Sequence, residues 1–459
     1  MEGFPPSPPE RRHPLLEGLF GASHAPIVES SQRALLVSLS SLKGGEGRGE
    51  EAKGLRITTP SPQPSPCLGG AREKNLRRGF GIANLTERKL GRLRPWAWGP
   101  DSVELFEPIF KNLTGERRTG TGSFNSDIAQ LYSKAWSAAL LKRILGRAGS
   151  PLPADRRARS DAPYLCTEHE VGVVVDSPDV ALAAITNSRQ RGHHKIVIKE
   201  ALGLAGSNAM RLFEPEILET HRRWITNAVE NGRQLVVEPW LERVLDFSVQ
   251  LEMTTDGLKL RGYTGLINDA KGQFQGNTAA PGHQKKFPAN VIALFAEPPD
   301  IAQRLHQLYA TVFEMLEEEF RRANFLGPVG IDAFVYRTAQ GDCRLKPIVE
   351  INPRYTMGRL MVELMKHVAP GSYGWFRLVS RKQALAEGFE DFAAFARSVS
   401  ERFPLRFEGE PTPRIREGAI CLNDPARAEV CLAVFQVVHG ESGFASLADL
   451  MASSSSQRA

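Results

Sequence analysis

The stretch GIDAFVYRTAQGDCRLKPIVEINPR, residues Gly330–Arg354, decides the fold. Two runs rich in β-branched and aromatic residues flank a short polar segment with a glycine, a pattern that predicts an antiparallel hairpin. Side chains two residues apart on a strand share a face, so Glu350 and Asn352 point the same way. The second strand therefore carries a carboxylate and a carboxamide side by side.

A turn centred near Gln340–Gly341 would place Asp332 opposite Val349 or Glu350. Two carboxylates and one carboxamide then converge on one face of the hairpin. Mg²⁺ prefers such oxygen ligands and usually keeps phosphate and water in its shell. The alternative interpretation is a hairpin whose polar face meets solvent, and the hairpin by itself leaves both interpretations open.

The segment KIVIKEALGLAGSNAMRL, residues 195–212, predicts a strand that ends at Lys199, followed by a turn loosened by Gly203 and Gly206. Glycines let backbone N–H groups approach phosphate oxygens, and a nearby lysine supplies positive charge. The spacing matches neither a Walker A motif nor GxGxxG, so an ordinary turn is the alternative.

The segment QLVVEPWLERVLDFSVQL, residues 234–251, predicts two strands joined at a proline. Glu238 ends the first strand, where backbone groups are placed to pair with an adenine edge. Asp246, on the second strand, is placed to accept hydrogen bonds from ribose hydroxyls. The alternative is two core strands joined by a polar connection.

Around these segments, strands alternate with helices. Helical spacing of apolar residues runs from Asp127 to Leu145, and a long helix is expected over 299–323. A helix starting near Leu360 follows the hairpin, and its neighbour Arg359 either binds a substrate carboxylate or simply begins the helix. Gly262–Gly282 predicts either a substrate or lid region, with Asn277 near the metal, or an ordinary hairpin plus loop. The pattern as a whole predicts an α+β or α/β fold with much antiparallel sheet.

Bulk composition narrows the class of protein. The 459 residues are 41% hydrophobic and 24% charged, as in globular domains, and the net charge of +6 is too modest to indicate a nucleic-acid binder. Five scattered cysteines without a CxxC pair argue against a disulfide framework or a zinc site. The sequence shows neither the apolar core of a signal peptide nor a run of about 20 apolar residues, so no membrane association and a cytoplasmic location are expected.

The order of the three segments resembles the ATP-grasp superfamily, which includes D-alanine–D-alanine ligase, biotin carboxylase and carbamoyl-phosphate synthetase. VEPWLERVLDFSV looks like the adenine–ribose segment of the D-alanine ligases, and VEINPRYTMGR resembles the EMNPR-type segment of the carboxylases. The resemblance covers about residues 132–364. It implies an α+β ATP-grasp fold, in which two α/β subdomains clasp a nucleotide, with a degenerate N-terminal region.

The resemblance implies a role for each matching residue. ATP would be held by the residues Lys134, Lys199, Gly203, Gly206, Glu238, Leu241 (through its backbone) and Asp246, and Mg²⁺ by Asp332, Glu350 and Asn352. Arg354 would act in catalysis by stabilising negative charge at the acyl or phosphoryl centre. Two positions depart from the family pattern. Ser133 replaces the aspartate before the first lysine, and Gly330 replaces an arginine of the D-alanine ligases, which argues against D-Ala–D-Ala as the product.

The expected activity is an ADP-forming carboxylate–amine ligase that uses ATP and Mg²⁺ on small-molecule carboxylate and amine substrates. The alternatives are an ATP-grasp carboxylase, a phosphotransferase and a non-catalytic nucleotide-binding protein. The sequence names neither substrate and indicates no oligomeric state.

The expected organisation is a disordered low-complexity segment at 1–75, a partial N-terminal region at 76–130, a small ATP-grasp subdomain at 131–235, a large one with the metal site at 236–370, and a C-terminal α/β extension with a disordered tail at 371–459.

Overall fold

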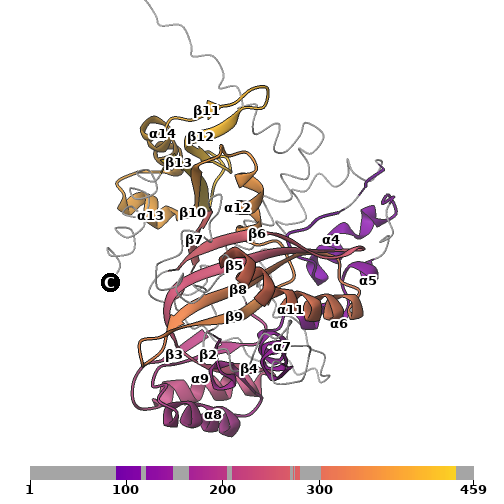
Figure 1. Ribbon diagram of the computed structural model, residues 1–459, viewed down its shortest axis with the longest axis vertical. Helices are drawn as coiled ribbons and strands as arrows, with labels where there is room; N and C mark the ends of the chain where they lie inside the picture. The colour runs from indigo at the N-terminus through magenta and orange to yellow at the C-terminus, as the bar shows by residue number, and fades with distance from the viewer. Residues whose placement is uncertain are drawn as a thin grey trace, which may run out of the picture.

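The computed structural model describes residues 89–91, 93–114, 120–147, 165–203, 209–268, 272, 274–279 and 301–440. The expected disorder of residues 1–75 and of the C-terminal tail lies outside these residues. Two antiparallel sheets and the helices on their faces make up the described chain (Figure 1). Within the described ranges, no helix is both long and apolar enough to cross a membrane.

The smaller sheet has four antiparallel strands in the order β1-β4-β2-β3. These are β1 (Val173–Val175), β2 (Ile196–Glu200), β3 (Ala209–Leu212) and β4 (Leu235–Pro239). Two helices, α8 (Pro178–Gln190) and α9 (Glu219–Glu230), pack their apolar side chains on one face of this sheet. Alternation along the strands leaves Lys199 and Glu238 on the opposite face.

The larger sheet has nine antiparallel strands in the order β11-β12-β13-β10-β7-β6-β5-β8-β9. Its first part consists of β5 (Glu242–Thr254), β6 (Gly257–Asn268), β7 (Phe274–Ala279), β8 (Gly327–Arg337) and β9 (Cys343–Asn352). The C-terminal strands continue the same sheet through β10 (Ser372–Ser380), which pairs with β7. They are β11 (Arg406–Glu408), β12 (Arg414–Cys421) and β13 (Cys431–His439), with α13 (Arg381–Ala386) and α14 (Phe392–Arg402) beside them.

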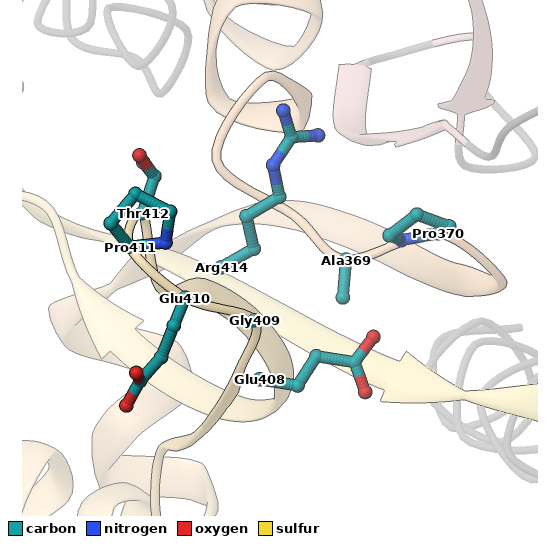
Figure 2. A pocket seen from close by; sticks show the side chains of 8 residues that line it. All are labelled: Ala369, Pro370, Glu408, Gly409, Glu410, Pro411, Thr412 and Arg414. Atoms are coloured by element: carbon teal, nitrogen blue, oxygen red, sulfur yellow. The ribbon is translucent and has the colours of Figure 1, made fainter.

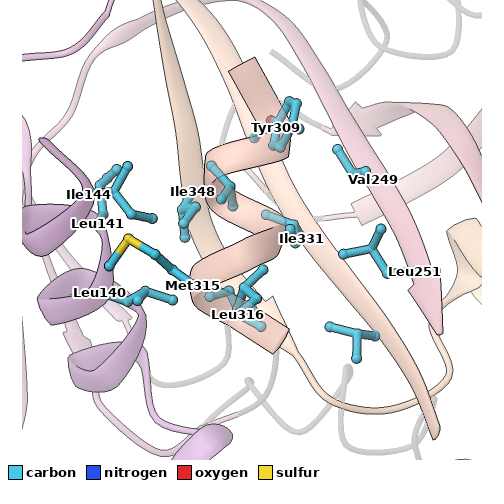
Figure 3. Packing of buried hydrophobic residues seen from close by; sticks show 14 of the residues in the cluster. Leu140, Leu141, Ile144, Val249, Leu251, Tyr309, Met315, Leu316, Ile331 and Ile348 are labelled. Carbon is cyan, nitrogen blue, oxygen red and sulfur yellow. The ribbon is translucent and has the colours of Figure 1, made fainter. Parts of the chain in front are cut away.

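The main core lies on the apolar face of the larger sheet. Helices α7 (Lys134–Arg147) and α11 (Ile301–Arg322) pack there, and Figure 3 shows side chains of both helices meeting those of β5, β8 and β9. Each of these strands alternates, so its apolar residues enter this core and its polar residues face the other way. Helix α12 (Met357–Met365) contacts β5, β6 and β7.

The predicted helix over Asp127–Leu145 is wrong in one respect, because the structure has two helices there. Helix α6 (Ser126–Leu131) ends at Tyr132, and α7 begins at Lys134. The backbone N–H of Lys134 donates to the Ala201 carbonyl oxygen at 2.8 Å. This break therefore brings the first turn of α7 to the end of β2.

Near the N-terminus, α4 (Pro100–Phe110) and α5 (Gly120–Ser123) precede α6. Gly99 is the N-cap residue of α4, and its N–H donates to the Ser102 hydroxyl at 2.8 Å. The domain limits stay a prediction. Strand β4 belongs to the small sheet up to Pro239, and the larger sheet extends to His439.

Candidate active site

Asp332 on β8 and Glu350 on β9 are directly opposite each other in the hairpin. The Asn352 side-chain amide donates to Asp332 Oδ2 at 3.2 Å, and Arg354 Nη2 donates to Asn352 Oδ1 at 3.0 Å. Burial, and next the charge of Glu350, raise the pKa of Asp332 to about 6. The predicted hairpin register is therefore confirmed, with Glu350 as the partner of Asp332.

This donor set fits a hard cation by its chemistry. In the part of the chain that the structure describes, no group of three or more His, Cys, Asp and Glu side chains is suited to a metal. The hairpin instead offers the carboxylates of Asp332 and Glu350, while the Asn352 amide oxygen accepts from Arg354. Burial, and second to it the Glu350 charge, disfavour ionisation of Asp332, and a divalent cation between the two carboxylates would offset both effects.

Lys134 lies beside this set. Its Nζ atom is 3.2 Å from Glu350 Oε1 and donates to the Gly203 carbonyl oxygen at 2.6 Å. The side chain is buried, because it begins α7 where that helix meets the end of β2. The structure thus joins Lys134, Gly203 and Glu350, whereas Gly206 lies outside the described residues.

Lys199 and Glu238 form a buried ion pair on the face of the small sheet that is opposite α8 and α9. They are diagonal neighbours on β2 and β4, which is within reach of long side chains. Burial lowers the pKa of Lys199, and the Glu238 charge opposes that effect. Burial would raise the pKa of Glu238, but the ammonium groups of Lys199 and Lys346 hold it well below its usual range.

Asp246 lies on the same face of the larger sheet as Asp332, because Ser248, two residues along β5, is directly opposite Asp332. Asp246 accepts from Arg243 Nη1 at 3.1 Å. The Arg243 guanidinium carbon lies 4.7 Å from the centre of the Phe334 ring, and Leu241 is buried just before β5. The predicted ribose and adenine residues therefore follow one another along the connection between the two sheets.

Three buried polar residues near this site were not identified from the sequence: Ser248, Gln250 and Lys346. Gln250 Nε2 donates to Ser248 Oγ at 2.7 Å, and Thr356 Oγ1 donates to Gln250 Oε1 at 2.7 Å. The polar residues of DFSVQLE recur at every second position, which was the available signal for Ser248 and Gln250.

Other residues named from the sequence lie elsewhere. Arg359 is buried and donates to Glu252 at 2.7 Å and to Glu363 at 2.8 Å, so it anchors α12 to the sheet. Gly262–Gly282 contains the β6–β7 hairpin, and Asn277 donates there to the Gly265 carbonyl oxygen at 3.1 Å. The hairpin interpretation of that segment is confirmed for its described residues.

The departure at Gly330 has a structural reason. A Cβ atom at this position would lie 2.7 Å from Cγ2 of Thr356. Thr356 is the N-cap of α12 and is also bound to Gln250, so it is not free to move aside. A larger side chain at position 330 would therefore displace the start of α12.

A pocket at the C-terminal end of the molecule does not belong to this site. Figure 2 shows its lining, and none of these residues is among the candidate site residues: Ala369, Pro370, Glu408, Gly409, Glu410, Pro411, Thr412 and Arg414. We assign it no role in the chemistry.

The two sheets bring the candidate site residues together. A small antiparallel sheet bearing Lys199 and Glu238 is joined to a large antiparallel sheet bearing the acidic pair, with Lys134 between them. The two antiparallel sheets with helices on their faces are the α+β architecture expected from the sequence.

Comparison with known proteins gives distant structural likenesses. Neither a protein-family model nor a curated protein matches the chain. It is similar to N5-carboxyaminoimidazole synthetase from Staphylococcus aureus complexed with ADP, at 11% identity and a TM-score of 0.39 over 71% of this chain and 72% of that chain. Biotin carboxylase from Campylobacter jejuni is 13% identical, with a TM-score of 0.41 over 76% of this chain and 70% of that chain. D-alanyl-alanine synthetase A from Vibrio cholerae is 14% identical, with a TM-score of 0.33 over 58% of this chain and 67% of that chain.

Proposed function

We propose that this chain is an ADP-forming ATP-grasp ligase that activates a carboxylate as an acyl phosphate for attack by an amine. One observation carries the proposal. The Asp332–Glu350 pair is completed by the Asn352 amide, with the Lys134 ammonium 3.2 Å from Glu350. Oxygen ligands and a lysine at one point are what a metal-bound triphosphate needs.

In this proposal the described residues bind and orient ATP. Lys134 and Lys199 neutralise charge on the phosphates, and the Gly203 carbonyl oxygen accepts from Lys134. Glu238 and the Leu241 backbone hold adenine, and Asp246 holds the ribose. The sheets fix these groups in advance, so little reorganisation is needed when ATP binds.

Asp332, Glu350 and Asn352 would hold Mg²⁺, which when bound supplies charge neutralisation at the phosphates. A substrate carboxylate oxygen attacks the γ-phosphorus and ADP leaves. The amine then attacks the acyl carbon, and phosphate leaves to give the amide. Arg354, already held by Asn352, is placed to stabilise negative charge during these steps.

No nucleophilic side chain is required by this route, because the carboxylate and the amine are both substrates. An ATP-grasp carboxylase or a phosphotransferase would use the same nucleotide groups. The alternative from another class is a nucleotide sensor without turnover. If the chain is such a sensor, substitution of Glu350 should lower its nucleotide affinity and change nothing else.

The test is ADP release from MgATP with a panel of carboxylates, each with and without amine acceptors. Amine-dependent ADP and phosphate, together with a product of amide mass, would support the ligase. ADP release that forms a phosphorylated product without amine would favour the phosphotransferase. Saturable nucleotide binding with no turnover across the panel would favour the sensor.

A further inference from the structure

Lys346 is a buried lysine at the junction of the two sheets. Its side chain lies on β9, and the residue is 2% exposed. The ammonium group donates to Glu238 Oε2 at 2.8 Å and to the Glu170 carbonyl oxygen at 2.9 Å. A buried ammonium group is tolerated only with such partners, so Lys346 is held at this point by both of them.

The Glu238 carboxylate is paired with two lysines. Lys199 contacts its Oε1 atom and Lys346 its Oε2 atom, so strands from both sheets fix the orientation of the carboxylate. An ionised carboxylate has about four acceptor sites. These two contacts leave acceptor capacity in a fixed plane, which suits an amino group such as the exocyclic amine of adenine.

Lys346 also changes the net charge around Glu238 and Lys199. Two ammonium groups and one carboxylate leave this trio with an excess of one positive charge. Without Lys346, Glu238 and Lys199 would form a neutral pair, and Lys199 would attract phosphate less strongly. The carboxylate would also be free to turn about its last bond.

We propose that Lys346 is a positioning residue for the nucleotide: it holds Glu238 in the orientation that accepts from adenine and leaves Lys199 available to phosphate. This inference rests on the proposed nucleotide site. It adds a selectivity determinant, because a fixed acceptor favours adenine, whose 6-position carries an amine, over guanine, which carries a carbonyl oxygen there.

The neighbouring Tyr336 offers a matched control. Its hydroxyl donates to Glu170 Oε2 at 2.6 Å, so it belongs to the same buried polar network. Lys346 contacts the backbone oxygen of Glu170 and not this carboxylate. Tyr336→Phe therefore perturbs the network on the far side of Lys346 and leaves the Lys346–Glu238 contact in place.

The experiment measures the affinities of MgATP and MgGTP calorimetrically for the full chain and for Lys346→Met, Glu238→Gln, the double variant and Tyr336→Phe. Lys346→Met should weaken ATP binding by about tenfold, the size of a lost charge-assisted hydrogen bond, and lower the ATP preference over GTP. The double variant should bind ATP no more weakly than Glu238→Gln. Tyr336→Phe should bind both nucleotides as the unmodified chain does.

Unchanged ATP affinity and selectivity in folded Lys346→Met would overturn the inference. So would an equal loss in Tyr336→Phe, because that result means a structural role for the whole network. If Lys346→Met does not fold, the double variant decides, and a further loss beyond Glu238→Gln would also contradict the inference. No ATP binding by the unmodified chain would instead refute the proposed function.

Discussion

Asp332 and Glu350 face each other on neighbouring antiparallel strands, with the Lys134 ammonium 3.2 Å from Glu350 and the Asn352 amide 3.2 Å from Asp332. Two carboxylates held this close repel each other, which is unfavourable for folding alone. The cation of the proposed function would relieve this repulsion. The predictions below follow from this arrangement and its surroundings.

Glu350→Gln should lower kcat by about 100-fold or more, because it removes one anionic ligand and the partner of Lys134. The protein should remain folded, since glutamine keeps the size of the side chain. Steady-state ADP release measures the effect, with Glu242→Gln on the same sheet as an exposed control. Wild-type turnover in Glu350→Gln would contradict the assignment.

Lys134→Met should weaken MgATP binding by about tenfold, because a phosphate-binding charge is lost. Lys142→Met, eight residues further along α7, is the control and should bind ATP normally. Titration calorimetry with a non-hydrolysable ATP analogue separates this effect from turnover. Equal affinities for the two variants would count against a phosphate-binding role for Lys134.

Asp332→Asn should stabilise the metal-free protein at pH 7.5 by about 3 kcal/mol. The pKa of Asp332 rises from 3.8 to about 6 on folding, so the folded protein holds this proton more tightly than the unfolded chain does. The ionised carboxylate costs no stability below pH 3.8, and the cost grows as the pH rises to about 6.

The measurement is urea unfolding with a chelator present at several pH values. The gain of the Asp332→Asn variant should vanish near pH 4 and be complete above pH 7. A variant that is less stable than the unmodified protein at pH 7.5 would show that Asp332 is held by favourable interactions instead.

Arg359→Met should lower the free energy of unfolding by about 2–4 kcal/mol, because it leaves Glu252 and Glu363 without their shared partner. The affinity for substrates should change little in the folded fraction. Chemical unfolding and the substrate KM test the two parts separately. A raised carboxylate KM with unchanged stability would restore the substrate-binding interpretation of Arg359.

The sequence predicts the acidic pair well because the relevant information is local. The turn near Gln340–Gly341 and the two-residue period of a strand bring Asp332 close to Glu350, and the register shift between Asp332 and Phe334 sets the exact pairing. The same period in DFSVQLE indicates the face that carries Ser248 and Gln250, although not their partners.

Other features depend on contacts that no local pattern contains. Apolar spacing continues through Tyr132 and Ser133, and the helix break there accompanies a hydrogen bond from Lys134 to Ala201 across 67 positions of chain. Lys346 meets Glu238 from another sheet, 108 positions away. The C-terminal strands join the large sheet through the β10–β7 pairing, which is also non-local.

The most direct test of the central claim follows oxygen atoms. The purified chain is incubated with MgATP, amine acceptors and a panel of carboxylates labelled with ¹⁸O in the carboxyl group. The mass of the released phosphate is then measured by mass spectrometry. Acyl phosphate formation predicts phosphate that carries one ¹⁸O atom for the true substrate. Phosphate that takes its new oxygen only from water, or a chain that binds no ATP, would contradict the account.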